Sequence, residues 1–574
     1  DSSEKRELID MAMAVEGMPR HTSTHAAGVV IASKSIDEFV PLIKNGEQIS
    51  TQYNMIELEE LGLLKMDFLG LRTLTVISDA VKLIYYNKGL KVNIYDIDVN
   101  DKKVMNLFTN AETIGIFQFE SEGMRAFLRD LKPTRFDDLI AANSLFRPGP
   151  MNEIPNYIKN SHNQANIQYL HPKLKPILET TYGTIVFQEQ VMQIVQQLAG
   201  FSLGEADNLR RAMGKKKMDV MEENREYFVH GKIENGEIIL PGAIRNGVDE
   251  ITANKIYDLM IDFAKYAFNK SHSAAYSYIA MQTAWLKTYY PEEFMASLLS
   301  SVMGNTVKVY LYIKEAKNLG IEILPPSVNS SFNKFSVENG KIRMGLSTIK
   351  TVGKNLVDSI IMERKKSPFI SFEDFIERMV KSKTSNVNKA AIEALILSGA
   401  MDSFGLKRSQ MYQVYIPMIE SFSTSGRNVL TGQEDIFSIL NDENTSFEIP
   451  NMDEFPKREL LKKEKEYLGV YITDHPYNSY NELVKDRINF TTLDLLNGNI
   501  KYNKSVYFGG IITSVKQILT KRNDDMAFLE LEDNYGSIEA VVFPSIFTKY
   551  RELIKEDNAI FINGTLQIND RDSA

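Results

Sequence analysis

Cysteine is absent from this sequence of 574 residues. Its absence excludes disulfide bonds, thiolate catalysis, zinc ribbons and iron–sulfur clusters, and it fits a cytoplasmic protein. Histidine is scarce, with seven residues, of which His21 and His25 stand four apart. β-Branched residues surround this pair. A zinc-binding helix would have a Glu directly after the first His, and none is there. We therefore expect neither zinc nor haem nor an iron–sulfur cluster.

Long apolar runs are also missing. No run reaches the length that a membrane-spanning helix needs, and we recognise no signal peptide, so we expect no membrane partner. The formal net charge of −9 argues against a surface covered uniformly in positive charge. A nucleic-acid site would therefore be a local basic groove on an acidic body. Length suggests about three or four domains.

Positive charge is concentrated in Leu209–Lys217, which holds five cations in nine residues and no acid. On a helix, spacings of three, four and seven residues bring side chains to one face. The residues that share a face in this way are Arg210 with Met213, Gly214 and Lys217, and Arg211 with Lys215. Such cations repel one another unless water or an anion, such as a triphosphate or a nucleic-acid backbone, screens them. A solvated basic face at a helix end is the alternative.

A second polar run, Asn269–Ser273, precedes an apolar helical sequence. Asn or Ser at this place would cap the helix, and the free N–H groups of its first turn would make an anion site. Taken alone, His272 at a helix start is a cap or a satisfied surface residue. Two helix-associated phosphate sites in one region favour the functional interpretation.

Two segments near the start of the chain, Ala26–Ala32 and Leu63–Leu69, read as buried strands. Side chains alternate along a strand, so Lys65 and Asp67 point to the same face. Buried charges need a partner or a metal ion. A salt bridge at a strand end is one explanation, and a metal-binding carboxylate beside a phosphate-neutralising cation is the other.

Seven long motifs, in one order along the chain, resemble the α subunit of the bacterial replicative DNA polymerase III, family C. They are H-A-A-G-V-V-I-A, G-L-L-K-M-D-F-L-G-L-R-T-L, G-I-F-Q-F-E-S, S-L-F-R-P-G-P-M, F-Q-E-Q-V-M-Q-I, L-R-R-A-M-G-K-K-K and F-N-K-S-H-S-A-A-Y. Collinear long motifs are far more specific than a single short pattern. The resemblance covers essentially the whole chain.

The resemblance implies a multidomain α+β fold. Its expected parts are the end of a thumb and the C-terminal part of a nucleotidyltransferase-like palm at 1–75, large mostly α-helical fingers at 76–325, a helix-hairpin-helix and sliding-clamp-binding domain at 326–490, and an OB-fold β-barrel, truncated at its end, at 500–574. The activity it implies is template-directed transfer of a nucleotide from dNTP to a primer 3′-hydroxyl. The expected partners are primer–template DNA, dNTP, the sliding clamp and other replisome subunits.

For the chemistry, the resemblance implies two Mg²⁺ ions held by three Asp residues. Asp67 matches the third of these, and Lys65 matches a palm lysine that lies against the nucleotide phosphates. The other two belong to a D-x-D motif upstream of the third, and none precedes Asp67. Asp96-Ile97-Asp98 follows it in a turn-like linker, and we interpret it as a decoy. We therefore expect a fragment without the full catalytic triad. A non-catalytic DNA-binding and clamp-docking chain is the alternative function.

The resemblance also assigns residues to the nucleotide. Arg210 and Arg211 match positions that grip the triphosphate, and Lys215 continues the positive track. His272 matches the sugar gate that blocks a ribose 2′-hydroxyl, with Tyr266, Asn269 and Tyr276 as weaker candidates for the same pocket. Arg147, in the rigid turn R-P-G-P, presents a cation to DNA or is part of an ordinary loop. An RNA-synthesising nucleotidyltransferase is a further alternative, which the sugar gate would decide.

Beyond Pro325-Pro326, the turn Thr351–Gly353 opens a helix with free N–H groups and with Lys350 and Lys354 beside it. Such a turn can grip a duplex phosphate as a helix-hairpin-helix, or it can belong to a plain helix pair. The similar turn Leu397–Gly399 favours two such units. With Gly353, the two lysines are the expected duplex contacts.

Ser421–Thr431 is polar and is expected to be mobile. After it, Gln433, Asp435, Ile436 and Phe437 lie in a segment that resembles the internal clamp-binding motif of the family. From Ser505, alternating short strands predict a small β-barrel, where the family carries an OB fold that binds single-stranded template. Lys516, Lys521 and Arg522 are its expected contacts, and a barrel without a ligand is the alternative.

Overall fold

The structure is a computed structural model that describes residues 3–18, 24–25, 27–214, 218–264, 266, 268–382, 387–431, 447–496, 504–520 and 523–567. The chain divides into two compact units, Asp1–Leu74 and Thr75–Ala574. In these residues, no helix combines the length and the apolar character that crossing a bilayer would take.

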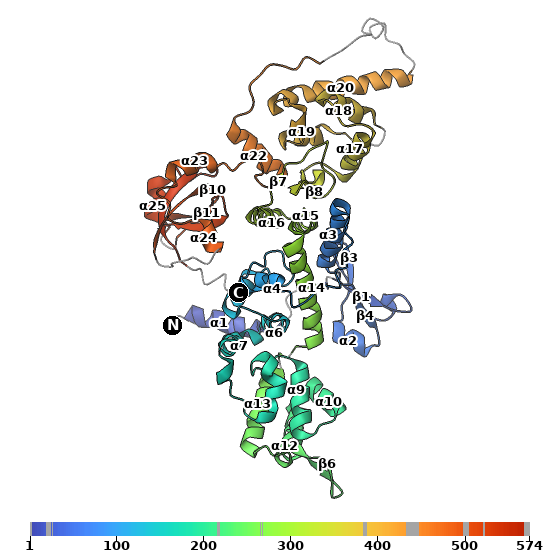
Figure 1. The fold of residues 1–574 in the computed structure, drawn as a ribbon, viewed down its shortest axis with the longest axis vertical. Helices are drawn as coiled ribbons and strands as arrows, with labels where there is room; N and C mark the ends of the chain where they lie inside the picture. Colours follow the sequence, from blue (N-terminus) through green and yellow to red (C-terminus); the bar gives the residue numbers. More distant parts are fainter. Residues whose placement is uncertain are drawn as a thin grey trace. The chain divides into compact units, whose positions relative to one another are not determined.

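The first unit is built from short elements around a small apolar core (Figure 1). Its elements are α1 Ser3–Val15, β1 Gly28–Ile31, a 3₁₀ turn Ile36–Glu38, β2 Leu42–Asn45, β3 Gln48–Thr51, α2 Met55–Glu60 and β4 Leu64–Asp67. β1 pairs antiparallel with β4, and β2 with β3. Helix α2 begins at Met55 because the Asn54 side chain accepts the N–H groups of Ile56 and Glu57. The core holds Val40, Leu58 and Leu63.

The two strands predicted in this unit are present, but the expectation that they are buried is wrong. In β1 the side chains alternate between partly buried and exposed, and those of Val29 and Ile31 are exposed. In the part of the chain that the structure describes, β1 and β4 form a sheet of only two strands. One face of this sheet packs on the small core, and the other face is exposed. Lys65 and Asp67 do share a face of β4, as predicted.

The second unit begins in α3 and is mostly helical through residue 318. Its helices are α3 Arg72–Lys88, α4 Lys102–Thr109, α5 Glu122–Leu131, α6 Phe136–Leu145, α7 Ile154–His162, α8 Lys175–Leu178, α9 Gln188–Ile194, α10 Leu203–Gly214, α11 Met218–His230, α12 Gly242–Arg245, α13 Glu250–Ala264, α14 Lys270–Tyr289, α15 Pro291–Ser301 and α16 Thr306–Asn318. Short helical turns lie at Pro150–Glu153, Gln164–Asn166, Pro172–Leu174, Glu179–Thr181 and Val195–Ala199. A hairpin is formed by β5 Lys232–Glu234 and β6 Glu237–Leu240.

Helix α14 joins two apolar cores of this region, and Figure 1 shows it as a long, nearly straight helix. Ala280, Met281 and Ala284 lie in the core formed with α4, α5 and α6. Leu286, one turn later, belongs to the larger core that continues through α15 and α16. The lone Trp285 is partly buried against both cores, as expected of a core residue.

Residues 323–484 continue this larger core with small strands and helices. The elements are β7 Ile323–Leu324, β8 Ser336–Glu338, β9 Lys341–Arg343, the turn Leu346–Thr348, α17 Lys354–Lys366, α18 Phe372–Lys381, α19 Lys389–Leu397, the turn Asp402–Phe404, α20 Arg408–Thr431, α22 Lys457–Leu468 and α23 Asn478–Val484. Helix α18 buries Phe372, Phe375, Ile376 and Met379, which have the spacing of one helical face. Helix α20 continues to Thr431, so Ser421–Thr431 is helical. The mobility expected of this segment stays a prediction.

The C-terminal region is an antiparallel sheet in the order β12-β11-β10-β13. Its elements are α24 Thr492–Leu496, β10 Ser505–Leu519, β11 Asp525–Glu532, β12 Ser537–Val542, α25 Pro544–Tyr550 and β13 Ala559–Thr565. β10 is long enough to pair with β13 in its first half and with β11 in its second, with a bulge between Ile512 and Ser514. All three predicted strands are present.

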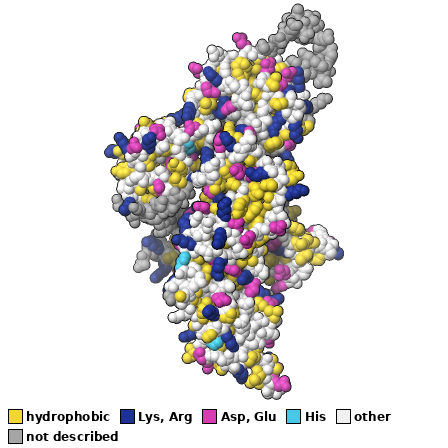
Figure 2. All heavy atoms as spheres, viewed as in Figure 1, with side chains coloured by type: hydrophobic (Ala, Val, Ile, Leu, Met, Phe, Trp, Pro, Cys, Tyr) yellow, Lys and Arg dark blue, Asp and Glu magenta, His cyan; other side chains and the backbone are white. Residues whose placement is uncertain are grey.

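The predicted fold class, a multidomain α+β chain with helix-rich fingers, a helix-hairpin-helix region and a C-terminal OB fold, is confirmed. The described strands of the OB fold form half of a barrel. On the face shown in Figure 2, Lys and Arg side chains are interspersed with Asp and Glu rather than gathered in one field. The domain boundaries stay predictions, and one continuous core contains residues from both sides of Pro325.

A buried ion pair locks α14 to α16 and gives a first prediction. Lys287, whose side chain is 1% exposed, donates to Glu315 at 2.6 Å and to the carbonyls of Glu112 and Ile114. Replacing Glu315 alone by Ala leaves a buried cation without its counter-charge, and we expect a loss of about 3–5 kcal/mol in the free energy of unfolding. Urea denaturation followed by circular dichroism measures it.

The exposed pair Lys334–Asp79 is the matched control. Its Asp79→Ala variant should lose no more than about 1 kcal/mol, because water screens an exposed ion pair. Lys287→Met combined with Glu315→Leu should cost less than Glu315→Ala alone. Equal losses in the two single variants would contradict a special role for burial.

Candidate functional site

A cavity of about 490 Å³ opens beside the N-terminal part of α14. It is lined by residues of the turn before α5, of α5, of α6 and the loop that follows it, and of α14: Phe117, Gln118, Glu120, Ser121, Met124, Asn143, Phe146, Arg147, Phe268, His272 and Tyr276. The structure thus brings together three of the residues predicted from sequence, Arg147, His272 and Tyr276. Arg147 lies more than 100 residues before the other two in the sequence.

An aromatic wall forms one side of this cavity. His272 and Tyr276 are one helical turn apart on α14, and their rings stack at 4.5 Å between centroids. Phe117 contacts Tyr276 at 5.3 Å, and Phe268 meets His272 edge-on at 5.2 Å. His272 is therefore held by two rings and faces the cavity. Its sequence position alone suggested only a helix cap or a surface residue.

Arg147 supplies the cavity with positive charge. Its guanidinium donates to the carbonyls of Ser144 at 2.8 Å and Tyr266 at 3.0 Å, and it lies 4.0 Å from the ring centre of Phe268. Among the described residues, no carboxylate lies within ion-pair distance of it. Burial lowers the pKa of Arg147. Gly149, with φ of +104°, has no room for a Cβ against the Tyr266 ring, so the R-P-G-P turn is fixed as predicted.

The two arginines of the basic stretch are neutralised within their own helix. Arg210 and Arg211 both contact the carboxylate of Asp207 on α10, each at 2.8 Å. Arg210 also donates to the Gln188 side chain at 3.0 Å. Hydrogen bonding from Arg210, before that from Arg211, lowers the pKa of Asp207. The expectation that only water or an external anion screens this pair is therefore wrong, because an acid one turn upstream does so.

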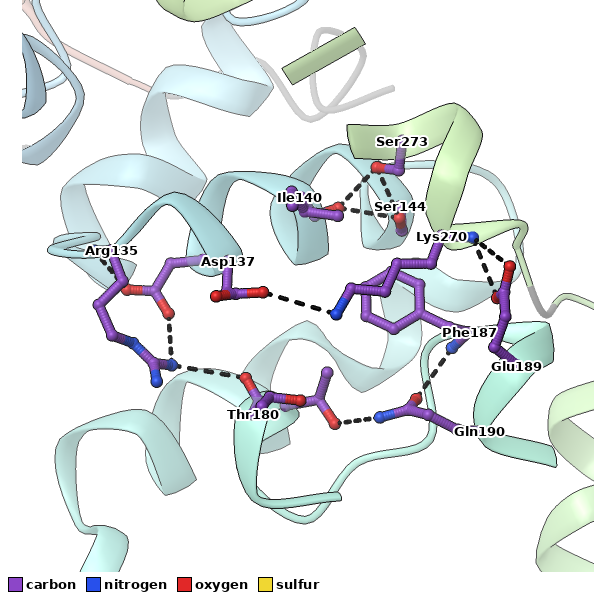
Figure 3. A network of polar contacts seen from close by, with 12 residues as sticks. Arg135, Asp137, Ile140, Ser144, Thr180, Phe187, Glu189, Gln190, Lys270 and Ser273 are labelled. Atoms are coloured by element: carbon purple, nitrogen blue, oxygen red, sulfur yellow. Dashed lines mark hydrogen bonds and ion pairs between the residues drawn. The ribbon is translucent and has the colours of Figure 1, made fainter. Parts of the chain in front are cut away.

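The start of α14 is capped as predicted, but its anion site is already filled by the chain itself. The Asn269 side chain accepts the N–H of His272 at 2.9 Å. Glu189, from the first turn of α9, accepts the backbone N–H of Lys270 (Figure 3). It also accepts from the side-chain amide of Asn269 at 3.0 Å. The Lys270 ammonium lies 3.6 Å from Asp137. The carboxylate of Glu189 occupies the place that a phosphate would take.

In the first unit, Asp67 and Lys65 form an ion pair of 2.6 Å. The ring nitrogen Nδ1 of His25 lies 3.9 Å from the same carboxylate oxygen. The hydrogen bond from Lys65 is the largest cause that lowers the pKa of Asp67. Gly28, opposite Asp67 on β1, lies so close to His25 and Lys65 that a Cβ would meet both side chains at 2.8 Å. The strand-end salt bridge is thus real, and it leaves Asp67 partly exposed.

Asp67 stands apart from other carboxylates. In the part of the chain that the structure describes, no group of three or more His, Asp or Glu could hold a metal ion. The Asp96 carboxylate accepts from Asn93, and that of Asp98 accepts the N–H of Asn100. Both are local turn contacts, as expected of a decoy.

The first predicted phosphate-gripping turn opens a helix as expected, but its N–H groups are not all free, because that of Val352 donates to the carbonyl of Ile349 at 3.2 Å. Helix α17 begins at Lys354 with Gly353 at its N-cap and no side-chain cap. Thr351 has a left-handed backbone with φ of +69°, which sharpens the turn. Lys350 and Lys354 are exposed on either side. The second predicted turn, Leu397–Gly399, is wrong as a grip: it is the buried C-terminal end of α19, and its N–H groups bond back to that helix.

Several predicted residues lie outside the described residues, namely Lys215, Gln433, Asp435, Ile436, Phe437, Lys521 and Arg522. In the OB region, Lys516 is exposed on β10. Tyr507 and Phe561, on the paired strands β10 and β13, stack at 5.9 Å with their rings 13° from parallel. Partly exposed, stacked rings on a sheet are the kind of surface on which nucleic-acid bases stack.

Known proteins with similar sequences are named as α subunits of DNA polymerase III. Family models match the α-subunit NTPase domain of bacterial DNA polymerase III at residues 1–70, its finger domain at 73–236, a helix-hairpin-helix motif at 320–411 and an OB-fold nucleic-acid-binding domain at 506–573. Relatives named DNA polymerase III subunit alpha occur in Bacillus subtilis, at 42% identity over 99% of this chain and 49% of that protein. The relative of the same name in Borreliella burgdorferi is 44% identical over 98% of this chain and 48% of that protein. The one in Aquifex aeolicus is 40% identical over 99% of this chain and 46% of that protein.

The chain belongs to the bacterial DNA polymerase III α-subunit family. It spans about half the length of the curated relatives that it matches. The finger-domain match includes Gln118, Asn143, Arg147 and Arg210 but ends before His272, so the cavity draws on residues inside and outside that match.

Sequence reasoning missed several members of the cavity and their partners. Gln118 and Glu120 lie in the motif G-I-F-Q-F-E-S, which carried the family resemblance without any assigned role. Glu189 and Asp207 neutralise predicted cationic sites from helical turns that looked like ordinary surface. A motif was therefore a usable signal for Gln118 and Glu120, and also for Glu189, which lies in F-Q-E-Q-V-M-Q-I. The contact of Glu189 with α14 was not readable, because the tertiary fold makes it.

The Glu189 contact gives the second prediction. Glu189→Ala leaves the N–H of Lys270 unsatisfied at a helix N-terminus, and we expect a loss of about 1–2 kcal/mol in the free energy of unfolding. Phosphate ions should restore part of this loss by taking the vacated place. Urea denaturation with and without phosphate measures both effects.

Glu237→Ala, on the exposed β6 strand, is the control and should show no phosphate-specific rescue. An identical phosphate effect in both variants would mean that the α14 terminus is not the site of binding.

Proposed function

We propose that this chain forms part of a bacterial replicative DNA polymerase and takes part in transferring a nucleotide from dNTP to a primer 3′-hydroxyl. The cavity beside α14 carries the proposal, because it sets His272, stacked on Tyr276, within one pocket with the cationic Arg147. In this proposal His272 blocks the ribose 2′-hydroxyl and the aromatic wall orients the nucleotide. The names of the relatives support it.

The proposed chemistry needs two Mg²⁺, and hard cations take several oxygen ligands. The described residues do not by themselves fit such a site, because Asp67 is a single carboxylate paired with Lys65. We assign Asp67 as one ligand, and Lys65 as the group that holds its carboxylate in place.

The remaining partners follow the same proposal. Duplex DNA would lie on the α17 turn, single-stranded template on the OB sheet, and the sliding clamp at the segment 433–437. Other replisome subunits would join the enzyme in the bacterial cytoplasm at the nucleoid. A second candidate, DNA binding and clamp docking without synthesis, is favoured by the single carboxylate at Asp67. Primer extension by this chain, compared with a polymerase of the relatives' full length, separates the two.

The sugar gate gives the third prediction. In the full-length polymerase that carries this sequence, His272→Ala removes the ring that fills the space beside the sugar. We expect incorporation of ribonucleotides relative to deoxyribonucleotides to rise by about one to two orders of magnitude, because a steric block is lost. Single-nucleotide primer extension with matched rNTP and dNTP measures the ratio.

His230→Ala, on α11 and outside the cavity, is the control and should leave sugar selectivity unchanged. If His272→Ala also left it unchanged, the cavity would not hold the nucleotide sugar, and the RNA-synthesising alternative would gain support.

The α17 turn gives the fourth prediction. Lys350→Glu together with Lys354→Glu should weaken duplex binding and reduce the slope of log K against log salt by about 2, since each lost phosphate contact removes about 0.9. Fluorescence anisotropy with labelled duplex at several salt concentrations measures the slope.

Lys365→Glu, an exposed lysine in the last turn of the same helix, is the matched control and should leave the slope nearly unchanged. An unaltered slope in the double variant would place the turn away from DNA.

A further inference from the structure

Two side-chain amides in the cavity are uncommitted. Gln118 and Asn143 both line it, and neither side chain makes a hydrogen bond with any residue that the structure describes. The charged groups of the cavity are engaged: Glu120 accepts from Lys308 and Tyr312 at 2.8 Å each, and Arg147 donates to two carbonyls. Free amides that face a cavity are available to a ligand.

The position of Gln118 is fixed at the cost of backbone strain. Its φ is +65°, a left-handed conformation that few residues other than glycine adopt. Its neighbours enforce it: the N–H of Phe117 donates to Thr283 on α14, and Phe119 is fully buried and accepts from Thr113. Between these anchors the Gln118 side chain is turned out to the cavity. Strain that the surroundings enforce in this way is typical of functional sites.

Asn143 is positioned by the same helix. The hydroxyl of Ser144, the next residue on α6, lies 2.9 Å from the hydroxyl of Ser273 on α14. Both hydroxyls donate to the carbonyl of Ile140, as Figure 3 shows. Ser273 in turn follows His272. Gln118 and Asn143 are therefore both held in register with His272, through two different contacts to α14.

The neighbourhood of His272 indicates which part of a nucleotide these amides meet. The 2′-hydroxyl that a sugar gate excludes lies on the minor-groove side of a base-paired nucleotide. The minor-groove edge offers purine N3 and pyrimidine O2 acceptors in every base pair. An amide NH₂ can donate to such an acceptor whichever base carries it. Such an amide would therefore detect whether the acceptor lies where a Watson–Crick pair puts it, and not which base carries it.

We propose that Gln118 and Asn143 donate hydrogen bonds to the minor-groove acceptors of the newly forming base pair and thereby determine its specificity. This inference rests on the proposed function, because it takes the sugar to lie at His272. A mispaired base displaces its acceptor and loses these bonds, so its incorporation is slowed, whereas all four correct pairs keep them.

The test uses variants that should fold. Gln118→Gly removes the amide and also relieves the left-handed strain, and Asn143→Ala places a better helix former in α6. In the full-length polymerase, kcat/KM is measured for dGTP and for 3-deaza-dGTP, which carries C–H in place of the N3 acceptor. Misincorporation opposite each template base is measured beside it. Gln193→Ala, an exposed residue of α9 outside the cavity, is the control.

We expect the wild type to use the analogue about tenfold less well than dGTP, since one hydrogen bond to a buried group is lost. The double variant should be about tenfold slower with dGTP but nearly indifferent to the analogue, and its mismatch discrimination should fall by about tenfold. Equal losses on dGTP and on the analogue in the double variant would overturn the inference. If His272→Ala changes sugar selectivity while the losses are equal, the inference fails and the proposed function stands.

Discussion

The region around the cavity depends on buried polar contacts of helix α14. Buried hydrogen-bonding groups are costly to leave unpaired, so each such side chain fixes the segment that satisfies it. Ser273 holds α6, Thr283 holds the turn at Phe117, and Lys287 holds the carbonyls of Glu112 and Ile114. These segments lie far apart in the sequence, and α14 is the frame that brings them to one cavity. Apolar packing alone would hold them near α14 without defining this register.

Internal acids occupy the cationic and dipolar sites that a phosphate would use. Asp207 holds Arg210 and Arg211, and Glu189 holds the start of α14. An anion at these arginines would have to displace the Asp207 carboxylate, an exchange that would lower its affinity and improve the rejection of stray anions. The exposed α17 turn differs, since its N–H groups have no side-chain cap. A phosphate at this turn would need no such exchange.

Local sequence patterns predicted much of this fold and little of the contacts within the site. The strands of the OB sheet follow from their alternation, because a single segment contains the whole signal. The cap at Asn269 was likewise readable. The partners were not: Glu189 lies 80 residues from Asn269, and the strain at Gln118 arises from anchors on other elements. The buried C-terminal turn at Leu397–Gly399 was misread because glycine marks both ends of helices.

The electrostatics of the cavity suit a ligand that carries both an apolar face and negative charge. Glu120 is the carboxylate that lines it, and Lys308 pairs with that group while Tyr312 donates to it. Arg147 has no acidic partner among the described residues, because it donates to carbonyls. Lys308 offsets the charge of Glu120, so the charge of Arg147 leaves the cavity positive. Its guanidinium is spread over the Phe268 ring and bound to carbonyls, which fixes its direction before any ligand arrives. A preorganised cation loses little freedom on binding. Flat rings on one side and an oriented charge on the other therefore favour a nucleotide over a simple anion, which would gain nothing from the aromatic wall.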